Sequence, residues 1–152
     1  MNAVLDINIT KANKSKLDTI SLENIPFGRV FTDHMLVAEY SNGVWKNVEI
    51  KPYEPLSMDP SLAALHYGQS IFEGIKAYRN AEGKAAIFRP YENFKRFNIS
   101  ATRMQMPTVP EEIFIDGMRE LISLDRNWIP TMPDHSLYIR PFMFATDAVL
   151  GV

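Results

Sequence analysis

The sequence predicts an α+β fold in which two helices pack against an antiparallel sheet. Strand-like runs come in two pairs, and a turn signal joins each pair, at Asn42-Gly43 and at residues 80–83. Two amphipathic helical stretches follow these strands. A group of strands followed by a group of helices is typical of an α+β domain, and 152 residues fit one such domain.

The N-terminal residues 1–25 mix Asn, Lys, Ser and Thr with scattered aliphatic residues, without helical or strand periodicity. We expect them to form an arm that carries no chemistry and packs on a neighbour. One strand is predicted from about residue 29 to Tyr40 and a second over residues 44–50. An extended connection should follow, because three prolines disfavour helix there: Pro52, Pro55 and Pro60.

The stretch over residues 65–79 is predicted to be strand-like, yet it contains Gly68 and Gly74. A glycine weakens a strand unless a bulge or the close approach of another group requires the missing side chain. The two glycines therefore indicate a crowded place, for which a ligand is one candidate occupant. The partner strand is predicted over residues 84–88.

Apolar residues at helical spacing predict both helices. The first begins at Pro90, with a buried stripe of Phe94, Phe97, Ala101 and Met104 beside a polar stripe of Asn93, Arg96, Ser100 and Arg103. The second follows a capping-box pattern at residues 108–111 and ends before Trp128-Ile129-Pro130. A last strand is predicted over residues 136–144, with Tyr138 and Arg140 on the same face.

Composition excludes several classes of function. The net charge is −2 and neither sign forms long blocks, so nucleic acid is not an expected partner. No apolar run is long enough to span a membrane, and an acid at Asp6 interrupts any signal peptide, so we expect a cytoplasmic protein without a membrane partner. The absence of cysteine excludes thiolate chemistry, and three isolated histidines do not indicate a metal site.

Two arginines are candidates for anion binding. Arg96 is either a solvated charge on a helix face or the partner of a phosphate or carboxylate, because its planar guanidinium donates two parallel hydrogen bonds. Arg140 is predicted to lie in an otherwise apolar strand, where it needs an anion, either an internal carboxylate or that of a substrate. Tyr67 and Tyr138 offer hydroxyl groups suited to the edge of an apolar pocket, although most such tyrosines are core residues.

Sequence signals for other catalytic or binding sites are weak. His66 has no companion carboxylate at a telling spacing, so we interpret it as structural. The pair Asp33-His34 is a weak signal for a hydrolase triad, because no Gly-x-Ser-x-Gly elbow presents a nucleophile. No glycine-rich phosphate loop occurs, so side chains and isolated amides must hold any phosphate.

Several motifs together resemble the N-terminal domain of the branched-chain amino-acid aminotransferases, which are pyridoxal-phosphate enzymes of the D-amino-acid-aminotransferase-like fold (fold type IV). The resemblance covers residues 26–152, and its motifs are Phe27-Gly28-x-x-Phe31-Thr32-Asp33-His34-Met35, Leu65-His66-Tyr67, Phe72-Glu73-Gly74-Ile75-Lys76-Ala77, Asn93-x-x-Arg96, Leu137-Tyr138-Ile139-Arg140-Pro141 and Leu150-Gly151-Val152. Their common order and separations make the set far more specific than any one motif.

The resemblance implies roles for seven residues. Arg96 matches the position that grips the phosphate of pyridoxal 5'-phosphate, and Tyr67 and Arg140 match positions that recognise the substrate carboxylate. Phe27 and Tyr138 match walls of the pocket for the aliphatic side chain. The remaining two belong to a loop that reaches the neighbouring subunit's site in a homodimer, where Tyr67 also acts across the subunits: Leu150 and Val152.

The implied activity is transfer of the amino group of leucine, isoleucine or valine to 2-oxoglutarate, with amino acids and 2-oxo acids as partners. In the family, the lysine that binds the cofactor belongs to the C-terminal domain, and no lysine here matches it; Lys76 is interpreted as structural. We therefore expect this chain to be inactive alone. The alternatives are a non-catalytic module for dimerisation or assembly, or a related enzyme such as a D-amino-acid aminotransferase or aminodeoxychorismate lyase.

Overall fold

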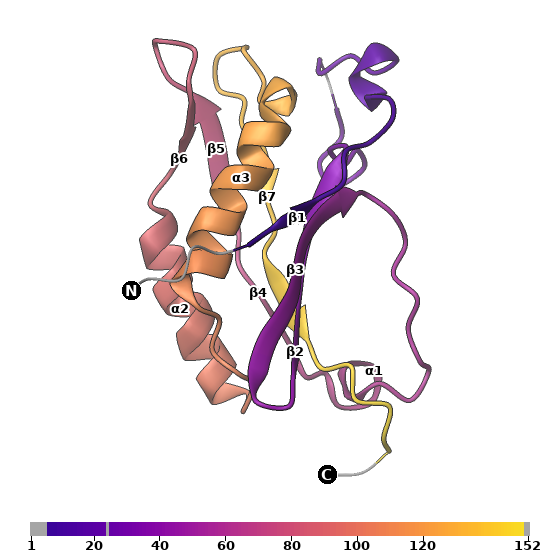
Figure 1. Ribbon diagram of the computed structural model, residues 1–152. Helices are drawn as coiled ribbons and strands as arrows, with labels where there is room; N and C mark the ends of the chain where they lie inside the picture. Colours follow the sequence, from indigo (N-terminus) through magenta and orange to yellow (C-terminus); the bar gives the residue numbers. More distant parts are fainter. Residues whose placement is uncertain (1–5, 24, 151–152) are drawn as a thin grey trace.

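The computed structural model describes residues 6–23 and 25–150, and it confirms the α+β fold class. Helices α2 (Pro90–Arg103) and α3 (Gly117–Leu124) lie on the left in Figure 1, and the hairpin of β2 (His34–Ser41) and β3 (Val44–Pro52) lies to their right, where β2 contacts α3. The described strands form three small sheets, and not the single sheet that we expected.

The first sheet confirms the predicted hairpin but corrects the arm. Asn42 and Gly43 both have positive φ, at 53° and 82°, so the turn has the backbone twist that a two-residue hairpin favours. Strand β2 begins at His34, later than predicted. Strand β1 (Asn8–Ile9) pairs parallel with β3, so part of the arm is built into this chain's own sheet and the purely antiparallel prediction was wrong.

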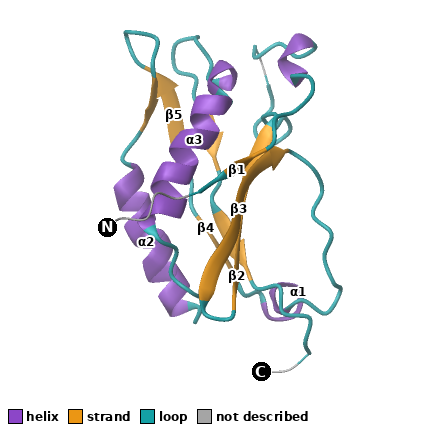
Figure 2. Cartoon of the chain, viewed as in Figure 1, coloured by secondary structure: helices purple, strands orange, loops and turns teal. Residues whose placement is uncertain are grey.

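The connection from β3 runs as a long loop to helix α1 (Ala63–Tyr67), which Figure 2 shows as a single turn. The strand prediction for residues 65–67 was therefore wrong. Gly68 has a φ of 66° and ends this helix in the left-handed conformation, so a helix end, and not a crowded strand, explains this glycine.

Two short strands follow α1 and lie in different sheets. Strand β4 (Ser70–Phe72) pairs with β8 (Phe142–Phe144), whereas β5 (Ile75–Arg79) pairs with β6 (Ala85–Ile87) and with β7 (Leu137–Ile139). The break between β4 and β5 falls at Glu73 and Gly74. The break between β7 and β8 falls at Arg140 and Pro141, so the single strand predicted over residues 136–144 is two strands.

Helix α2 begins at Pro90 as predicted, and its buried residues are Asn93, Phe97 and Ala101. The second helical stretch opens with a π-helical turn, Glu112–Asp116, that continues into α3. The predicted capping box is not formed, because no side chain caps the start of this stretch. Instead the Asn98 side chain holds the preceding loop, accepting from the backbone nitrogen of Val109 at 2.8 Å and donating to its carbonyl at 2.9 Å.

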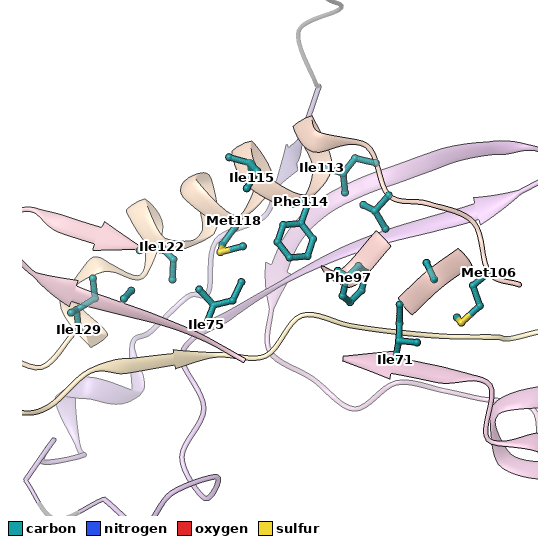
Figure 3. Packing of buried hydrophobic residues seen from close by; sticks show 13 residues of the cluster. Ile71, Ile75, Phe97, Met106, Ile113, Phe114, Ile115, Met118, Ile122 and Ile129 are labelled. Carbon is teal, nitrogen blue, oxygen red and sulfur yellow. The ribbon is translucent and has the colours of Figure 1, made fainter. Parts of the chain in front are cut away.

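The main core lies between the helices and the second and third sheets. Its members come from β4, β5, α2, the π-helical turn and α3 and from the loops beside them (Figure 3). Ile75, Ala77 and Ile115 are almost completely buried, at 2%, 0% and 1% exposure. This packing fixes β5 against both helices, and so it positions the β4–β5 and β7–β8 breaks where the candidate site residues lie.

Candidate functional site

Four side chains form a cluster at the two strand breaks, which we call the Tyr138 cluster: Phe27, Phe72, Tyr138 and Arg140. The Phe27 ring meets the Tyr138 ring edge-on, with centroids 5.0 Å apart. The Arg140 guanidinium lies 4.3 Å from the centre of the Phe72 ring and donates from Nε and Nη2 to Tyr138 Oη, at 3.1 and 2.9 Å. The structure therefore brings the predicted site residue Phe27 to Tyr138 and Arg140, which are distant from it in sequence, and adds Phe72.

The cluster requires a glycine beside it. A Cβ atom at Gly74 would lie 2.6 Å from Tyr138 Oη and 3.2 Å from two ring carbons, closer than side chains pack. We expected a crowded place at this glycine, and the structure confirms it. The crowding group is Tyr138 of the same chain.

The expectation for Arg140 was wrong in two respects. This residue lies between β7 and β8, not in a strand, and it is exposed. Within residues 6–23 and 25–150 no carboxylate pairs with it; instead, the Phe72 face and Tyr138 hydroxyl hold its guanidinium. A guanidinium stacked on aromatic rings keeps its charge available to an anion that approaches from outside.

Arg96 pairs with Glu73, which sequence reasoning missed. Arg96 donates from Nε to Glu73 Oε1 at 2.9 Å and from Nη2 to Oε2 at 2.7 Å, while Asn93 Nδ2 donates to Oε2 at 2.8 Å. The hydrogen bonds from Arg96 to Glu73 hold the pKa of Glu73 below its ordinary value, despite the opposing effect of burial. The same hydrogen bonds raise the pKa of Arg96. The carboxylate is therefore ionised near neutral pH. The Phe72-Glu73-Gly74 run and the Asn93 and Arg96 spacing were visible in the sequence, but no local pattern pairs them.

The other predicted site residues lie apart from the Tyr138 cluster. Tyr67 ends helix α1 with 50% of its surface exposed, and Leu150 is 66% exposed. Helix α1 lies beside the C-terminal segment, where Leu62 bridges to Ala148. Among the described contacts none joins Tyr67 or Leu150 to Tyr138 or Arg140, and Val152 lies outside the described residues.

The Asp33-His34 pair is part of a separate polar network that anchors the N-terminal segment. Ala12 donates its backbone N–H to His34 Nε2 at 2.8 Å, so Nδ1 carries the ring proton and donates to Asp125 Oδ1 at 2.6 Å. Asp33 accepts from Ser15 Oγ, the backbone of residue 16 and Trp128 Nε1, at 2.6, 2.9 and 2.9 Å. Both ring nitrogens of His34 and the carboxylate of Asp33 are therefore bonded to structural partners, and none is free to act in a catalytic triad. The geometry contradicts the hydrolase interpretation.

The His66 ring bonds the carbonyl of Pro60 at 2.9 Å, which is a structural role. Within the described ranges no group of His, Cys, Asp and Glu side chains could hold a metal ion. No helix in the same part of the chain is long and apolar enough to cross a membrane.

Comparisons with known proteins gave strong matches to individual proteins, although no family model matches. A branched-chain-amino-acid transaminase of Bacillus subtilis is 44% identical over 100% of this chain, which covers 42% of that protein. A branched-chain-amino-acid aminotransferase of Mycolicibacterium smegmatis is 47% identical over 86% of this chain and 36% of its own length.

Solved structures of branched-chain amino acid aminotransferases also match this chain. A T.th. branched-chain amino acid aminotransferase, solved with pyridoxamine 5'-phosphate, has a TM-score of 0.53 and 38% identity, over 72% of this chain and 32% of that one. The Escherichia coli enzyme has a TM-score of 0.56 and 29% identity, over 68% and 32%. The chain is a homologue of the branched-chain amino-acid aminotransferases that corresponds to their N-terminal part, and it spans about 40% of the length of its curated relatives.

Proposed function

We propose that this chain is the N-terminal domain of an enzyme that transfers the amino group of leucine, isoleucine or valine to 2-oxoglutarate with pyridoxal 5'-phosphate as cofactor. The observation that carries the proposal is the contact of Phe27, Tyr138 and Arg140, the residues to which the family resemblance gives substrate roles. Two rings and a guanidinium in one cluster suit an amino acid with an apolar side chain and a carboxylate.

The described residues fit the cofactor's phosphate. The Arg96 side chain is 64% exposed, and Glu73 occupies only Nε and one N–H of Nη2, so three N–H groups have no partner in the described parts of the chain. An exposed guanidinium with a free donor edge is suited to a phosphate. Pyridoxal 5'-phosphate, when bound, supplies the electron sink for amino-group exchange.

Each candidate site residue has a defined part in the proposed reaction. Arg96 binds the phosphate. Arg140 holds the substrate carboxylate, with its guanidinium oriented by Tyr138, and Phe27 excludes water from the aliphatic side chain. Tyr67 and Leu150, which stand apart from the cluster here, act across a homodimer in this proposal. The lysine that binds the cofactor and moves the substrate proton comes from a further domain.

Incomplete cover of the Tyr138 cluster supports this division of labour. Phe27 and Phe72 expose 76% and 63% of their surface, far more than rings in a finished pocket. A second domain or subunit that covers these rings would complete the pocket. A cytoplasmic location remains a prediction from the sequence.

The test is an amino-transfer assay on the protein expressed with whatever its reading frame encodes after Val152. We expect leucine, isoleucine and valine to react with 2-oxoglutarate, and Arg140→Gln to raise the KM for the amino acid by roughly tenfold or more. The matched control is Arg103→Gln, because Arg103 is an exposed arginine at the end of α2 with no described partner. Activity with D-amino acids or aminodeoxychorismate alone would favour the related enzymes, and a stop codon directly after Val152 would contradict the proposal.

A further inference from the structure

The Glu73 carboxylate is an unusual group for a strand break, because it is buried and receives every polar contact from helix α2 or its own turn. Its side chain is 10% exposed, whereas that of its partner Arg96 is 64% exposed. The two hydrogen bonds from Arg96 run in parallel to the two carboxylate oxygens, which is the geometry that fixes the guanidinium plane as well as its position.

Asn93 locks the carboxylate in turn. It is 8% exposed, and its Nδ2 donates to Glu73 Oε2 at 2.8 Å and to the carbonyl of Gly74 at 3.3 Å. Asn93 and Arg96 lie three residues apart on α2, so both reach the β4–β5 break from the same helix face. Glu73 is thus held by a buried amide on one side, and it holds an exposed guanidinium on the other.

The bidentate pair decides which part of Arg96 is free. A guanidinium has five N–H groups, and Glu73 takes the one on Nε and one on Nη2. The two N–H groups of Nη1 and the second of Nη2 remain, on the edge turned away from the carboxylate. An unrestrained arginine would have to lose side-chain freedom when it binds an anion, whereas this one has lost it already.

We propose that Glu73 is the positioning residue for Arg96, holding its guanidinium so that the Nη1 edge is presented to a phosphate group. The proposal rests on the proposed function, in which Arg96 binds the cofactor phosphate. It adds that a buried carboxylate, which by charge alone would weaken anion binding, strengthens it through orientation.

The opposite effects of charge and orientation give a decisive test at Glu73. Glu73→Gln removes the negative charge and replaces one acceptor oxygen with an amide that faces the guanidinium donors. If Glu73 positions Arg96, phosphate affinity falls roughly tenfold. If Glu73 only neutralises Arg96, affinity rises. Glu73→Asp keeps the charge but shortens the side chain, so positioning predicts weaker binding and neutralisation predicts no change.

The measurement is a titration of the chain with inorganic phosphate at neutral pH, followed by the NMR resonance of the Arg96 Nε–H group. The matched control is Glu92→Gln, which removes one negative charge from the exposed first turn of the same helix, where Glu92 pairs with Lys95 and not with Arg96. We expect the control to bind phosphate at least as well as the wild type, and both Glu73 variants to bind it more weakly and to lose the slow exchange of the Nε proton.

The possible outcomes distinguish the positioning role of Glu73 from the phosphate role of Arg96 in the proposed function. Phosphate binding at Arg96 with unchanged or higher affinity in both Glu73 variants would overturn the positioning role and leave the proposed function intact. An Arg96 resonance that no phosphate concentration shifts in the wild type would count against the phosphate role of Arg96 itself. Thermal unfolding identifies a variant that does not fold, and the other Glu73 variant then decides.

Discussion

The hydroxyl group of Tyr138 lies where a side chain at Gly74 would begin, 2.6 Å from the position of a Cβ atom. Arg140 and Phe27 hold that tyrosine from two other directions, so it cannot move aside without disturbing both contacts. The absence of a side chain at residue 74 is therefore a condition for the Tyr138 cluster.

Gly74→Ala should lower the free energy of unfolding by about 1–3 kcal/mol, because the added methyl group overpacks the contact with Tyr138. The effect should shrink in a Tyr138→Phe background, since that change removes the nearest atom. Urea unfolding of the four proteins in this cycle measures the coupling, which we expect to be about 1 kcal/mol. Strictly additive losses would mean that the two residues do not meet in solution.

Local patterns predicted the elements whose signals are local. The Asn42-Gly43 turn and the apolar spacing of α2 each depend on residues close in sequence, and both predictions were confirmed. Helix α1 was missed because its five residues are too few to show a helical period, and the glycine that ends it was interpreted as part of a strand.

Pairing between distant segments could not be predicted in the same way. The strand predicted over residues 136–144 splits because β7 pairs with β5 and β8 with β4, and the choice of partner is not encoded in that segment alone. Glu73 and Arg96 are likewise separated by 23 residues, so only the fold brings them together. The family resemblance supplied Phe27, Tyr138 and Arg140 of the Tyr138 cluster, but neither the site role of Phe72 nor the contacts among the four residues.

Acid should weaken the anchor of the N-terminal segment. Burial of Asp33 opposes ionisation, but hydrogen bonds from the Lys16 backbone, Ser15 and Trp128 together lower its pKa below the ordinary value of 3.8. A carboxyl with a lowered pKa in the folded state stabilises the fold above its unfolded pKa, and this contribution is lost as the pH falls through the folded value. The free energy of unfolding should therefore decrease as the pH falls below about 4.

The variant Asp33→Asn should be less stable near neutral pH and should lose part of that acid dependence. Chemical unfolding at a series of pH values, followed by tryptophan fluorescence from Trp45 and Trp128, measures both quantities. Asp147→Asn is the control, because Asp147 is exposed in the C-terminal segment. An acid dependence identical in Asp33→Asn and the wild type would show that this carboxyl does not contribute.

The core between β5 and the helices should be the main source of stability. Ile75 is 2% exposed and belongs to the core cluster, so Ile75→Ala should cost about 3 kcal/mol through lost burial and the cavity left behind. Ile99→Ala is the matched control, since Ile99 on α2 is 68% exposed and its truncation should change stability by about 0.5 kcal/mol or less. Equal losses in urea unfolding would place the core elsewhere.

Treatment of the chain with pyridoxal 5'-phosphate and then borohydride should label no lysine stoichiometrically. The proposed function places the lysine that binds the cofactor in a further domain. Lys76 is the lysine nearest the Tyr138 cluster along the strands, where it pairs with Tyr138 in the β5–β7 register, but its side chain is exposed and has no described partner that would hold it toward the cluster. Peptide mapping should give low, dispersed labelling of exposed lysines that falls as the reagent is diluted. Full labelling of one lysine at equimolar reagent would mean that this chain carries its own cofactor-binding lysine, and the proposed division between two domains would be wrong.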